Sequence, residues 1–265
     1  MITSNTNVLA PPPQAALRPV VVHYHLFKNA GTSVDETLRQ NFGMSWTKHE
    51  FAADRRENAN AVANFIRNNP HIEAFSSHTA LLPIPVVENV VIFPIVFIRH
   101  PIDRLRSAYE FERRQNASTA GARLAKALDF AGYLRELLKT PRHRQIRNFQ
   151  TFRLAYNESR HKCSELERAT AAIESFPFVG LVERFDESLS KLETSLQRLF
   201  PNFRAQPFHR NAALSRQAAL FDRLAEVSAM LGEELYGEIC AANSDDLVIY
   251  EKVVTRFNSA GRHPW

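Results

Sequence analysis

The hydrophobic pattern near the N-terminus predicts a buried strand that leads directly into a helix. An apolar run occupies residues 20–27 and is long enough for a central strand of a parallel sheet. Residues 28–31 then turn the chain. From Val34 to Phe42 apolar side chains recur every four positions, which predicts the buried stripe of a helix.

The start of this helix carries residues that commonly cap helices. Thr32 lies three residues before Asp35, and Ser33 lies three residues before Glu36, so both pairs fit the capping-box pattern. We therefore expect the helix to begin here and Gly43 to end it.

Further apolar runs predict the other strands, at residues 72–77, 94–98 and 178–182. Helical spacing of apolar residues predicts a short helix that ends before Pro70 and helices over residues 124–138, 163–176, 186–199 and 215–257, the last with a break at 243–245. This alternation indicates one α/β domain with a P-loop-like, mainly parallel sheet of about four or five strands, flanked by helices.

Length and composition indicate the residue range of that domain and the compartment in which it works. The chain has 265 residues, of which 45% are hydrophobic, enough to bury one large core. We expect residues 1–19 to be a disordered lead rather than a signal peptide, residues 20–257 to form the domain, and residues 258–265 to be a tail. No apolar stretch approaches the roughly 20 residues of a membrane span. The two cysteines are far apart in sequence and expected to be reduced, as in the cytoplasm.

The net charge of +5 fits an anionic ligand or acceptor. A basic chain would also suit nucleic acid, but we recognise no nucleic-acid-binding module and expect no such partner. The sequence does not indicate an oligomeric state.

The turn between the first strand and the first helix has the features of an anion site. Free backbone amides and the partial positive charge of the helix meet there with the Lys28 ammonium and the hydroxyls of Thr32 and Ser33. The ATP-binding loop GxxxxGK[ST] places its lysine after the glycines, whereas here the lysine comes first, and the loop is too short to wrap a triphosphate. A plain strand-to-helix connection is the alternative.

A second cation follows the strand at residues 94–98. Arg99 stands where a kinase or ATPase normally has a carboxylate for magnesium, so this position favours another anion. Ser107 follows on the next helix and can face the same crevice. A structural ion pair is the alternative for Arg99.

These two segments resemble motifs of the PAPS-dependent sulfotransferases, in the carbohydrate branch that includes heparan sulfate 2-O-sulfotransferase. Residues 25–33, HLFKNAGTS, resemble the 5′-phosphosulfate loop H-x-P-K-T-A-G-T-S, and residues 98–109 resemble the 3′-phosphate element L-R-D-P-x-x-R-x-x-S-x-Y. Similar pieces follow in the family's order at residues 148–155, 178–185 and 246–251. The departures are Phe27 for proline, Asn29 for threonine, His100 for aspartate and Tyr156 for glycine.

The resemblance implies a sulfotransferase fold and PAPS as the donor cosubstrate, with no metal. Lys28 would stabilise the leaving phosphate. The donor-binding positions that it implies are Lys28, Asn29, Ala30, Gly31, Thr32, Ser33, Arg99, Ser107 and Arg210.

The resemblance also implies a catalytic base, His78, which follows a short strand. The carboxyl ends of parallel strands share one edge, so His78 is expected near Lys28 and Arg99, and a histidine titrates near neutral pH. A loop histidine without a role is the alternative, and Glu36 and Glu50 are reserve candidates for the base.

Two histidines of the first strand are candidate metal ligands. His23 and His25 share one face of that strand, and we expect them to be packed or hydrogen-bonded, since no third ligand is obvious from the sequence.

The predicted activity is transfer of a sulfonate group from PAPS to a carbohydrate hydroxyl by in-line attack. The basic segment 142–153 could bind an anionic acceptor, or it could be a solvated helix face. An ATP-dependent small-molecule kinase and a non-catalytic nucleotide- or glycan-binding protein are the competing hypotheses.

Overall fold

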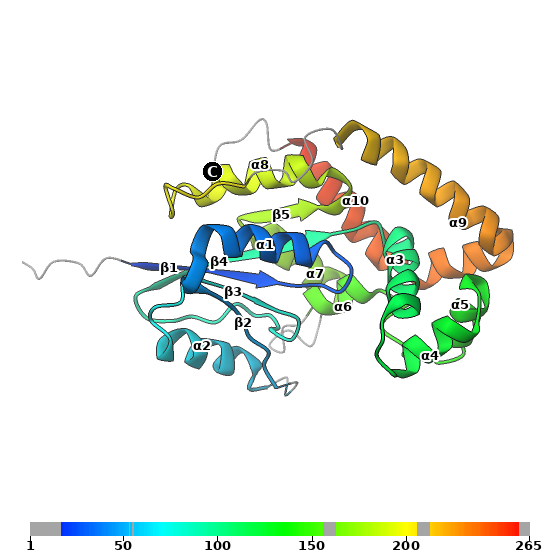
Figure 1. The fold of residues 1–265 in the computed structure, drawn as a ribbon, viewed down its shortest axis with the longest axis horizontal. Coiled ribbons are helices and arrows are strands. Elements are labelled where there is room, and N and C mark those ends of the chain that lie inside the picture. The colour runs from blue at the N-terminus through cyan, green and yellow to red at the C-terminus, as the bar shows by residue number, and fades with distance from the viewer. Residues whose placement is uncertain (1–16, 53, 55, 156–162, 206–212, 260–265) are drawn as a thin grey trace, which may run out of the picture.

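The fold is a five-stranded parallel sheet flanked by helices (Figure 1), as the sequence predicted. The computed structural model describes residues 17–52, 54, 56–155, 163–205 and 213–259. Within them the strand order is β2-β3-β1-β4-β5, and each neighbouring pair is parallel. The strands are β1 (Arg18–Tyr24), β2 (Trp46–Lys48), β3 (Ala74–Ser77), β4 (Val90–Ile98) and β5 (Phe178–Leu181).

The described helices cover both faces of the sheet and its carboxyl edge. They are α1 (Gly31–Phe42), α2 (Asn58–Asn68), α3 (Pro101–Arg114), α4 (Ala120–Ala127), α5 (Phe130–Leu138), α6 (Phe149–Leu154), α7 (Glu165–Ser175), α8 (Phe185–Leu196), α9 (Ala213–Ala242) and α10 (Ser244–Ser259). Two short 3₁₀ turns, η1 (Gly43–Ser45) and η2 (Val182–Arg184), follow α1 and β5. None of these helices is both long and apolar enough to cross a bilayer.

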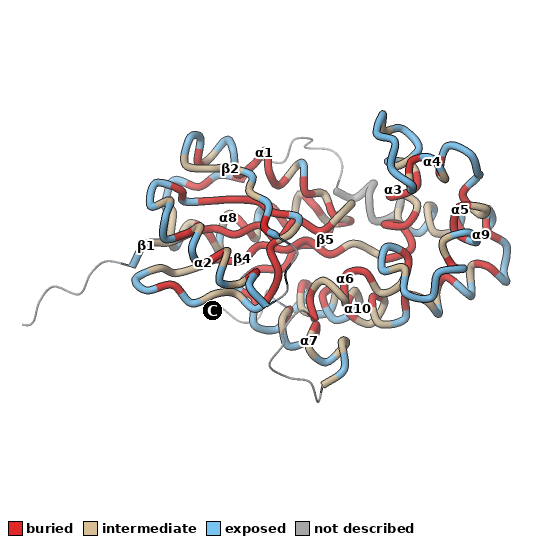
Figure 2. Tube along the Cα trace, turned by 90° about the horizontal axis from the view of Figure 1, so that it is seen from below, coloured by how far each residue is buried: buried red, intermediate tan, exposed pale blue. Residues whose placement is uncertain are grey.

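Alternate residues of β1 bury their side chains on opposite faces of the sheet, which explains its continuous apolar sequence. Val21 packs in a cluster with Leu38 of α1 and Leu192 of α8. Val20 and Val22 belong to the cluster under α2, α7 and α10. The strands other than the edge strand β2 are accordingly buried along most of their length (Figure 2).

Beyond the carboxyl edge of the sheet, α3, α4, α5 and α9 form a helical lobe (Figure 1). A third apolar cluster holds it together, with Leu105 of α3, Leu134 of α5 and Val227 of α9 among its fully buried members. The long α9 bends at Gly232, whose φ of 74° breaks the helical geometry. The lobe therefore faces the edge where β1, β3, β4 and β5 all end.

Several predicted elements differ in the structure. The expected single helix over residues 124–138 is two helices, because Asp129 accepts a hydrogen bond from the Gly132 amide and starts a new one. The first of them, α4, begins at Ala120, four residues before the expected start, and its N-cap is Thr119. The strand β2 was not predicted.

The terminal boundaries also shift slightly. The first strand begins at Arg18, two residues before the expected start of the domain, and the last helix runs to Ser259, inside the expected tail. Residues 1–16 and 260–265 lie outside the described residues.

Candidate active site

The loop between β1 and α1 has an open helix start. Lys28 and Ala30 adopt left-handed conformations, with φ of 66° and 59°, and Ala30 is the N-cap of α1 without a side-chain cap bond. The Ser33 amide donates to the Ala30 carbonyl at 3.0 Å and the Asn29 amide to the Leu26 carbonyl at 3.1 Å, so the amides of residues 30–32 are the ones left without an acceptor among the described residues. The predicted capping boxes are wrong, because the Asp35 and Glu36 side chains bind other groups.

Gly31 is required by its neighbour and not by its own backbone angles. A β-carbon at this position would lie 1.7 Å from Nε2 of His25, whose ring packs against the loop. The close approach of this imidazole therefore excludes any side chain here.

Asn29 fastens the loop to the sheet. It is almost fully buried, and its Nδ2 donates to the Phe97 carbonyl and to Oε1 of Gln150, both at 2.7 Å. Gln150 in turn binds the Arg99 backbone on both sides, at 3.0 and 2.8 Å. The backbone amide of Asn29 donates to the Leu26 carbonyl at 3.1 Å, so all N–H groups of Asn29 are used within the protein and its role is to hold the loop.

Arg99 lies at the end of β4, as predicted, and takes part in an ion pair. Its Nε donates to Oδ2 of Asp103 at 2.7 Å, and its Nη1 donates to the Lys28 carbonyl at 3.0 Å. Arg223 of α9 binds the same carboxylate at 2.7 Å. Burial alone would raise the pKa of Asp103, but the charge of Arg99 and the hydrogen bonds from Arg223 and Arg99 outweigh it and lower that pKa.

A cavity of ≈ 640 Å³ opens between the helix start and the end of β5. Ala30, Thr32 and Ser33 line it together with Arg99, so the structure brings four of the predicted donor residues to one cavity. The rest of the lining consists of Glu36, Asp103, Val182, Glu183, Phe185, Asp186 and Arg223.

Lys28 and Ser107 lie beside this cavity and do not belong to its lining. The Lys28 ammonium rests 4.5 Å from the centre of the Phe111 ring. Burial, followed by the charges of Arg99 and Arg114, lowers the pKa of Lys28. Ser107 is half-buried and stands one turn from Phe111 on α3, so it shares a helix face with it.

Glu183, at the end of β5, is a functional candidate that sequence reasoning did not single out. It lines the cavity, is 3% exposed and accepts a hydrogen bond from the His100 amide at 2.7 Å. Burial raises the pKa of its carboxyl to about 7. The motif at residues 178–185 contained it, but a glutamate after a strand gives no sign of such burial.

His78 follows β3 and is held by Glu50. Its Nδ1 lies 2.7 Å from Oε1 of Glu50. The same carboxylate accepts from the Thr79 amide at 2.9 Å, the Thr79 hydroxyl at 2.7 Å and the Ser77 hydroxyl at 3.2 Å. Burial would raise the pKa of Glu50, but these bonds, that from His78 foremost, lower it to about 2.

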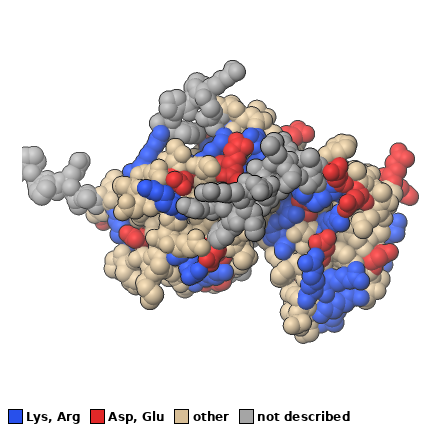
Figure 3. Space-filling view, turned by 45° about the horizontal axis from the view of Figure 1, so that its top comes forward, with Lys and Arg blue, Asp and Glu red and all other residues tan. Residues whose placement is uncertain are grey.

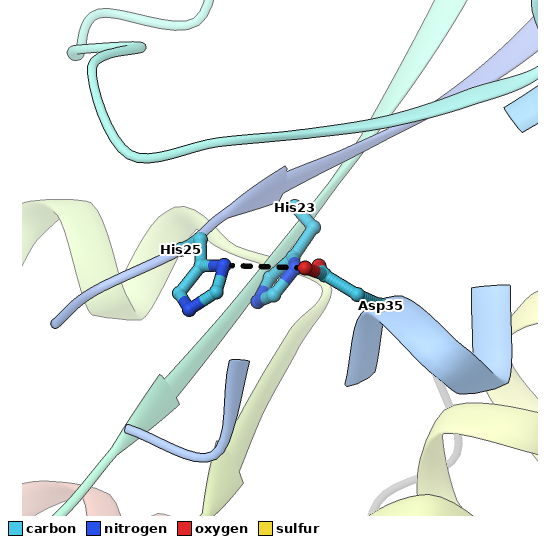
Figure 4. Close-up of side chains that lie close together, drawn as sticks. All are labelled: His23, His25 and Asp35. Carbon is cyan, nitrogen blue, oxygen red and sulfur yellow. Dashed lines mark hydrogen bonds and ion pairs between the residues drawn. The ribbon is translucent and has the colours of Figure 1, made fainter. Parts of the chain in front are cut away.

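A buried cluster of His23, His25 and Asp35 adjoins His78 (Figure 4). Asp35 lies 3.0 Å from Nδ1 of His23 and 3.5 Å from Nδ1 of His25, and the Lys48 ammonium approaches it to 2.8 Å. The His25 and His78 rings are 4.0 Å apart.

Asp35 corrects the expectation that the two strand histidines lack a third partner. The three side chains offer ligand atoms within 4.8 Å of one another, so they could hold a metal ion. The Lys48 ammonium already supplies a positive charge to Asp35, however, and Nδ1 of His23 is hydrogen-bonded to the same carboxylate. We therefore interpret the cluster as a hydrogen-bonded support for the loop and for His78.

The basic segment 142–153 is not one free cationic face. Arg144 pairs with Glu165 at 2.8 Å, Arg147 donates to the Leu138 carbonyl, and Arg153 donates to the His78 carbonyl at 2.6 Å. Exposed cations gather instead on the lobe that faces the site (Figure 3), where Arg113, Arg114, Arg123 and Lys126 are exposed on α3 and α4. Arg210 lies outside the described residues.

The reserve base Glu36 lies in the cavity wall but is engaged. Its carboxylate accepts from Arg39 at 2.8 and 2.6 Å and from Gln40 at 2.9 Å. It makes no contact with His78 in the described part of the chain.

Comparison with known proteins identifies a family for this chain. Residues 16–252 match the model of the Sulfotransferase family. A protein of Archaeoglobus fulgidus, described only as uncharacterized, is 39% identical over 249 residues, which cover 91% of this chain and 98% of that protein.

Proposed function

This chain belongs to the sulfotransferase family, and from that premise we propose that it transfers a sulfonate group from PAPS to a carbohydrate hydroxyl. The observation that carries the proposal is the joining of the anion loop and Arg99 in one cavity of ≈ 640 Å³, a volume that suits a nucleotide. Membership of the heparan sulfate 2-O-sulfotransferase-like branch is part of the proposal, because the sequence motifs resemble those of that branch.

The donor would lie across the cavity with its two phosphate groups at opposite ends. The open amides before Ser33 and the hydroxyls of Thr32 and Ser33 would hold the 5′-phosphosulfate. Arg99 would bind the 3′-phosphate, with Ser107 as a neighbour on α3.

Lys28 would act where charge develops during transfer. The bond between the sulfonate and the 5′-phosphate oxygen breaks as the acceptor oxygen attacks the sulfur in line, and the leaving phosphate gains negative charge. An ammonium that is partly desolvated on Phe111 would stabilise that charge more in the transition state than in the ground state. Lys28 thereby supplies the positive charge that the leaving group needs, and the proposal includes no metal.

His78 would receive the proton of the acceptor hydroxyl. When Nδ1 donates to Glu50, Nε2 is left with a lone pair to accept that proton, and the Glu50 carboxylate stabilises the imidazolium that forms. Glu50 itself is a poor base, because its pKa is about 2 and its oxygens already accept several hydrogen bonds. This distinction supports His78 over the carboxylate. The products are the sulfate ester and 3′,5′-ADP.

The acceptor would approach over the lobe. Phe111 is 41% exposed beside Lys28, and an exposed aromatic face next to exposed arginines of α3 suits a sugar ring that carries acidic groups.

Cys163 and Cys240 are free thiols, which supports a cytoplasmic setting for the reaction.

A titration of the purified protein with 3′,5′-ADP and with ADP tests the donor assignment. We expect at least tenfold tighter binding of 3′,5′-ADP, because Arg99 would bind its 3′-phosphate and ADP has no phosphate at that position. Equal affinity would contradict the proposal. Phosphate transfer from ATP that requires magnesium would instead support the kinase hypothesis.

A further inference from the structure

Arg223 reaches the donor cavity from a helix remote in sequence. It lies on α9, in the lobe, and lines the same cavity as Thr32, Ser33 and Arg99. Nothing in the spacing of charges along α9 distinguishes it from a solvated arginine.

Arg223 and Arg99 share one buried carboxylate. Arg223 donates from Nε to Oδ1 of Asp103 at 2.7 Å and from Nη2 to Oδ2 at 3.2 Å. Arg99 donates from Nε to Oδ2 at 2.7 Å, and the Asp103 side chain is only 1% exposed. Two guanidinium groups thus face one carboxylate, which leaves a positive excess at this end of the cavity.

Each guanidinium group has N–H donors that the described residues do not use. A guanidinium has five N–H groups in a planar fork. Arg223 uses Nε and Nη2, and Arg99 uses Nε and Nη1, so Nη1 of Arg223 and Nη2 of Arg99 have no acceptor among the described residues. Their side chains are 31% and 17% exposed, respectively, and both residues line the cavity.

Three further acidic residues line the same cavity, but among the described residues Asp103 is the only carboxylate that either guanidinium group binds. Glu36 is paired with Arg39, burial raises the pKa of Glu183 to about 7, and Asp186 lies in the first turn of α8. The position between the two arginines is therefore suited to a doubly charged anion that can accept hydrogen bonds from two forks at once.

We propose that Arg223 binds the 3′-phosphate of the donor together with Arg99, and that Asp103 is the positioning residue that holds both guanidinium groups. This inference rests on the proposed function and extends it, because it makes α9 part of the donor site. The selectivity for a 3′-phosphate then depends on two cations from α9 and the end of β4.

A purely structural role for Arg223, in fastening α9 to α3, is the competing explanation. The chain offers a matched control for it. Arg106 of α3 pairs with Glu226 of α9 at 2.6 Å, one turn from Arg223, and lines a different cavity. Glu226→Gln breaks an ion pair between the same two helices without touching the donor cavity.

Isothermal titration with 3′,5′-ADP and 5′-AMP, which differ only in the 3′-phosphate, separates these explanations. For Arg223→Ala we expect an affinity for 3′,5′-ADP about ten- to a hundredfold weaker, the usual loss for a charge-assisted hydrogen-bonded pair. Affinity for 5′-AMP should change less than about threefold. Arg223→Gln, which can still donate to Asp103, should show the same selective loss if the alanine variant fails to fold, and Glu226→Gln should bind both nucleotides as the unmodified protein does.

The outcomes distinguish the two proposals. An equal loss for both nucleotides, or no loss for either, would overturn the role of Arg223 and leave the sulfotransferase proposal in place. Failure of the unmodified protein to prefer 3′,5′-ADP over 5′-AMP would overturn both.

Discussion

His78 and Glu50 form the smallest unit on which the proposed chemistry depends. The Glu50 carboxylate accepts hydrogen bonds from the backbone amide and from the hydroxyl of Thr79, so it cannot move far. The His78 imidazole that donates to this carboxylate therefore keeps one orientation. The geometry separates the two roles: the carboxylate positions, and the imidazole transfers the proton.

Replacement of these two residues should lower turnover to different degrees. We expect kcat to fall about 10²- to 10⁴-fold for His78→Ala, the usual contribution of a general base, and about 10-fold or more for Glu50→Gln, which keeps shape but loses the charge. The double variant should be no slower than His78→Ala, because Glu50 acts through His78. Release of 3′,5′-ADP from PAPS in the presence of a glycan pool measures the rate.

Glu36→Gln is the control for this series. Glu36 lines the cavity but binds Arg39, so turnover of the Glu36→Gln variant should stay within about threefold of that of the unmodified protein. Full activity of His78→Ala, or a larger loss in Glu36→Gln than in His78→Ala, would refute the base assignment.

At the scale of elements, the loop between β1 and α1 depends on the packing of His25 against Gly31. Gly31→Ala should displace the imidazole, because a β-carbon would lie 1.7 Å from its Nε2. We expect at least tenfold weaker binding of 3′,5′-ADP and a loss of about 1–3 kcal/mol in the free energy of unfolding, as for other overpacked sites. Calorimetry and urea unfolding measure the two effects.

A second substitution gives this prediction a direct check. In His25→Ala/Gly31→Ala the space for the new methyl group exists, so the double variant should recover stability relative to the sum of the single changes. Gly237→Ala, on α9 with no atom within 4 Å of the new β-carbon, should leave binding unchanged and raise stability by about 0.5–1 kcal/mol, because alanine favours a helix interior. Additive losses in the double variant would show that the strain lies elsewhere.

The elements that the sequence predicted well are those buried on both faces. The apolar runs of β1, β4 and β5 have no alternative explanation once helical spacing is absent. The edge strand β2 has three residues, too few for a pattern. The break between α4 and α5 was missed because apolar residues keep helical spacing across Asp129.

Tertiary contacts overrode local signals at the start of α1. Asp35 has the spacing of a capping residue, but His23 and Lys48 bind its carboxylate from β1 and β2. A local pattern cannot show that a strand and an edge lysine will compete for the same side chain.

At the scale of the whole molecule, the buried Glu183 makes stability depend on pH. Its pKa is raised from 4.5 to about 7, so the folded protein retains a proton that the unfolded chain loses. This contribution is fully present below pH 4.5 and is lost as the pH rises through about 7. By linkage it amounts to about 3 kcal/mol.

Glu183→Gln should remove this dependence. Urea unfolding at pH 5 and pH 8 should show the unmodified protein losing about 3 kcal/mol more than the variant between the two conditions. If the free energy of unfolding changes equally in both proteins between pH 5 and pH 8, ionisation of Glu183 does not destabilise the folded state and this prediction is wrong. Because only the difference between the two proteins is used, other titrating groups cancel.

The predictable part of the site is the part carried by local motifs. Lys28, Thr32, Ser33 and Arg99 were predicted because each follows a strand or begins a helix, and the fold brings such positions to one edge. Arg223 and Glu183 become candidates only through the docking of the lobe and the depth of burial. Neither property is visible in a single sequence.

The two outer strands of the sheet bear on how this molecule meets others. The strands β2 and β5 have only three and four residues, and β2 ends in Lys48. Short outer strands with a charged residue expose few unpaired amides to a neighbouring chain. Copies of this protein should therefore resist joining strand to strand into fibrils, even though the interior strand β4 is wholly apolar.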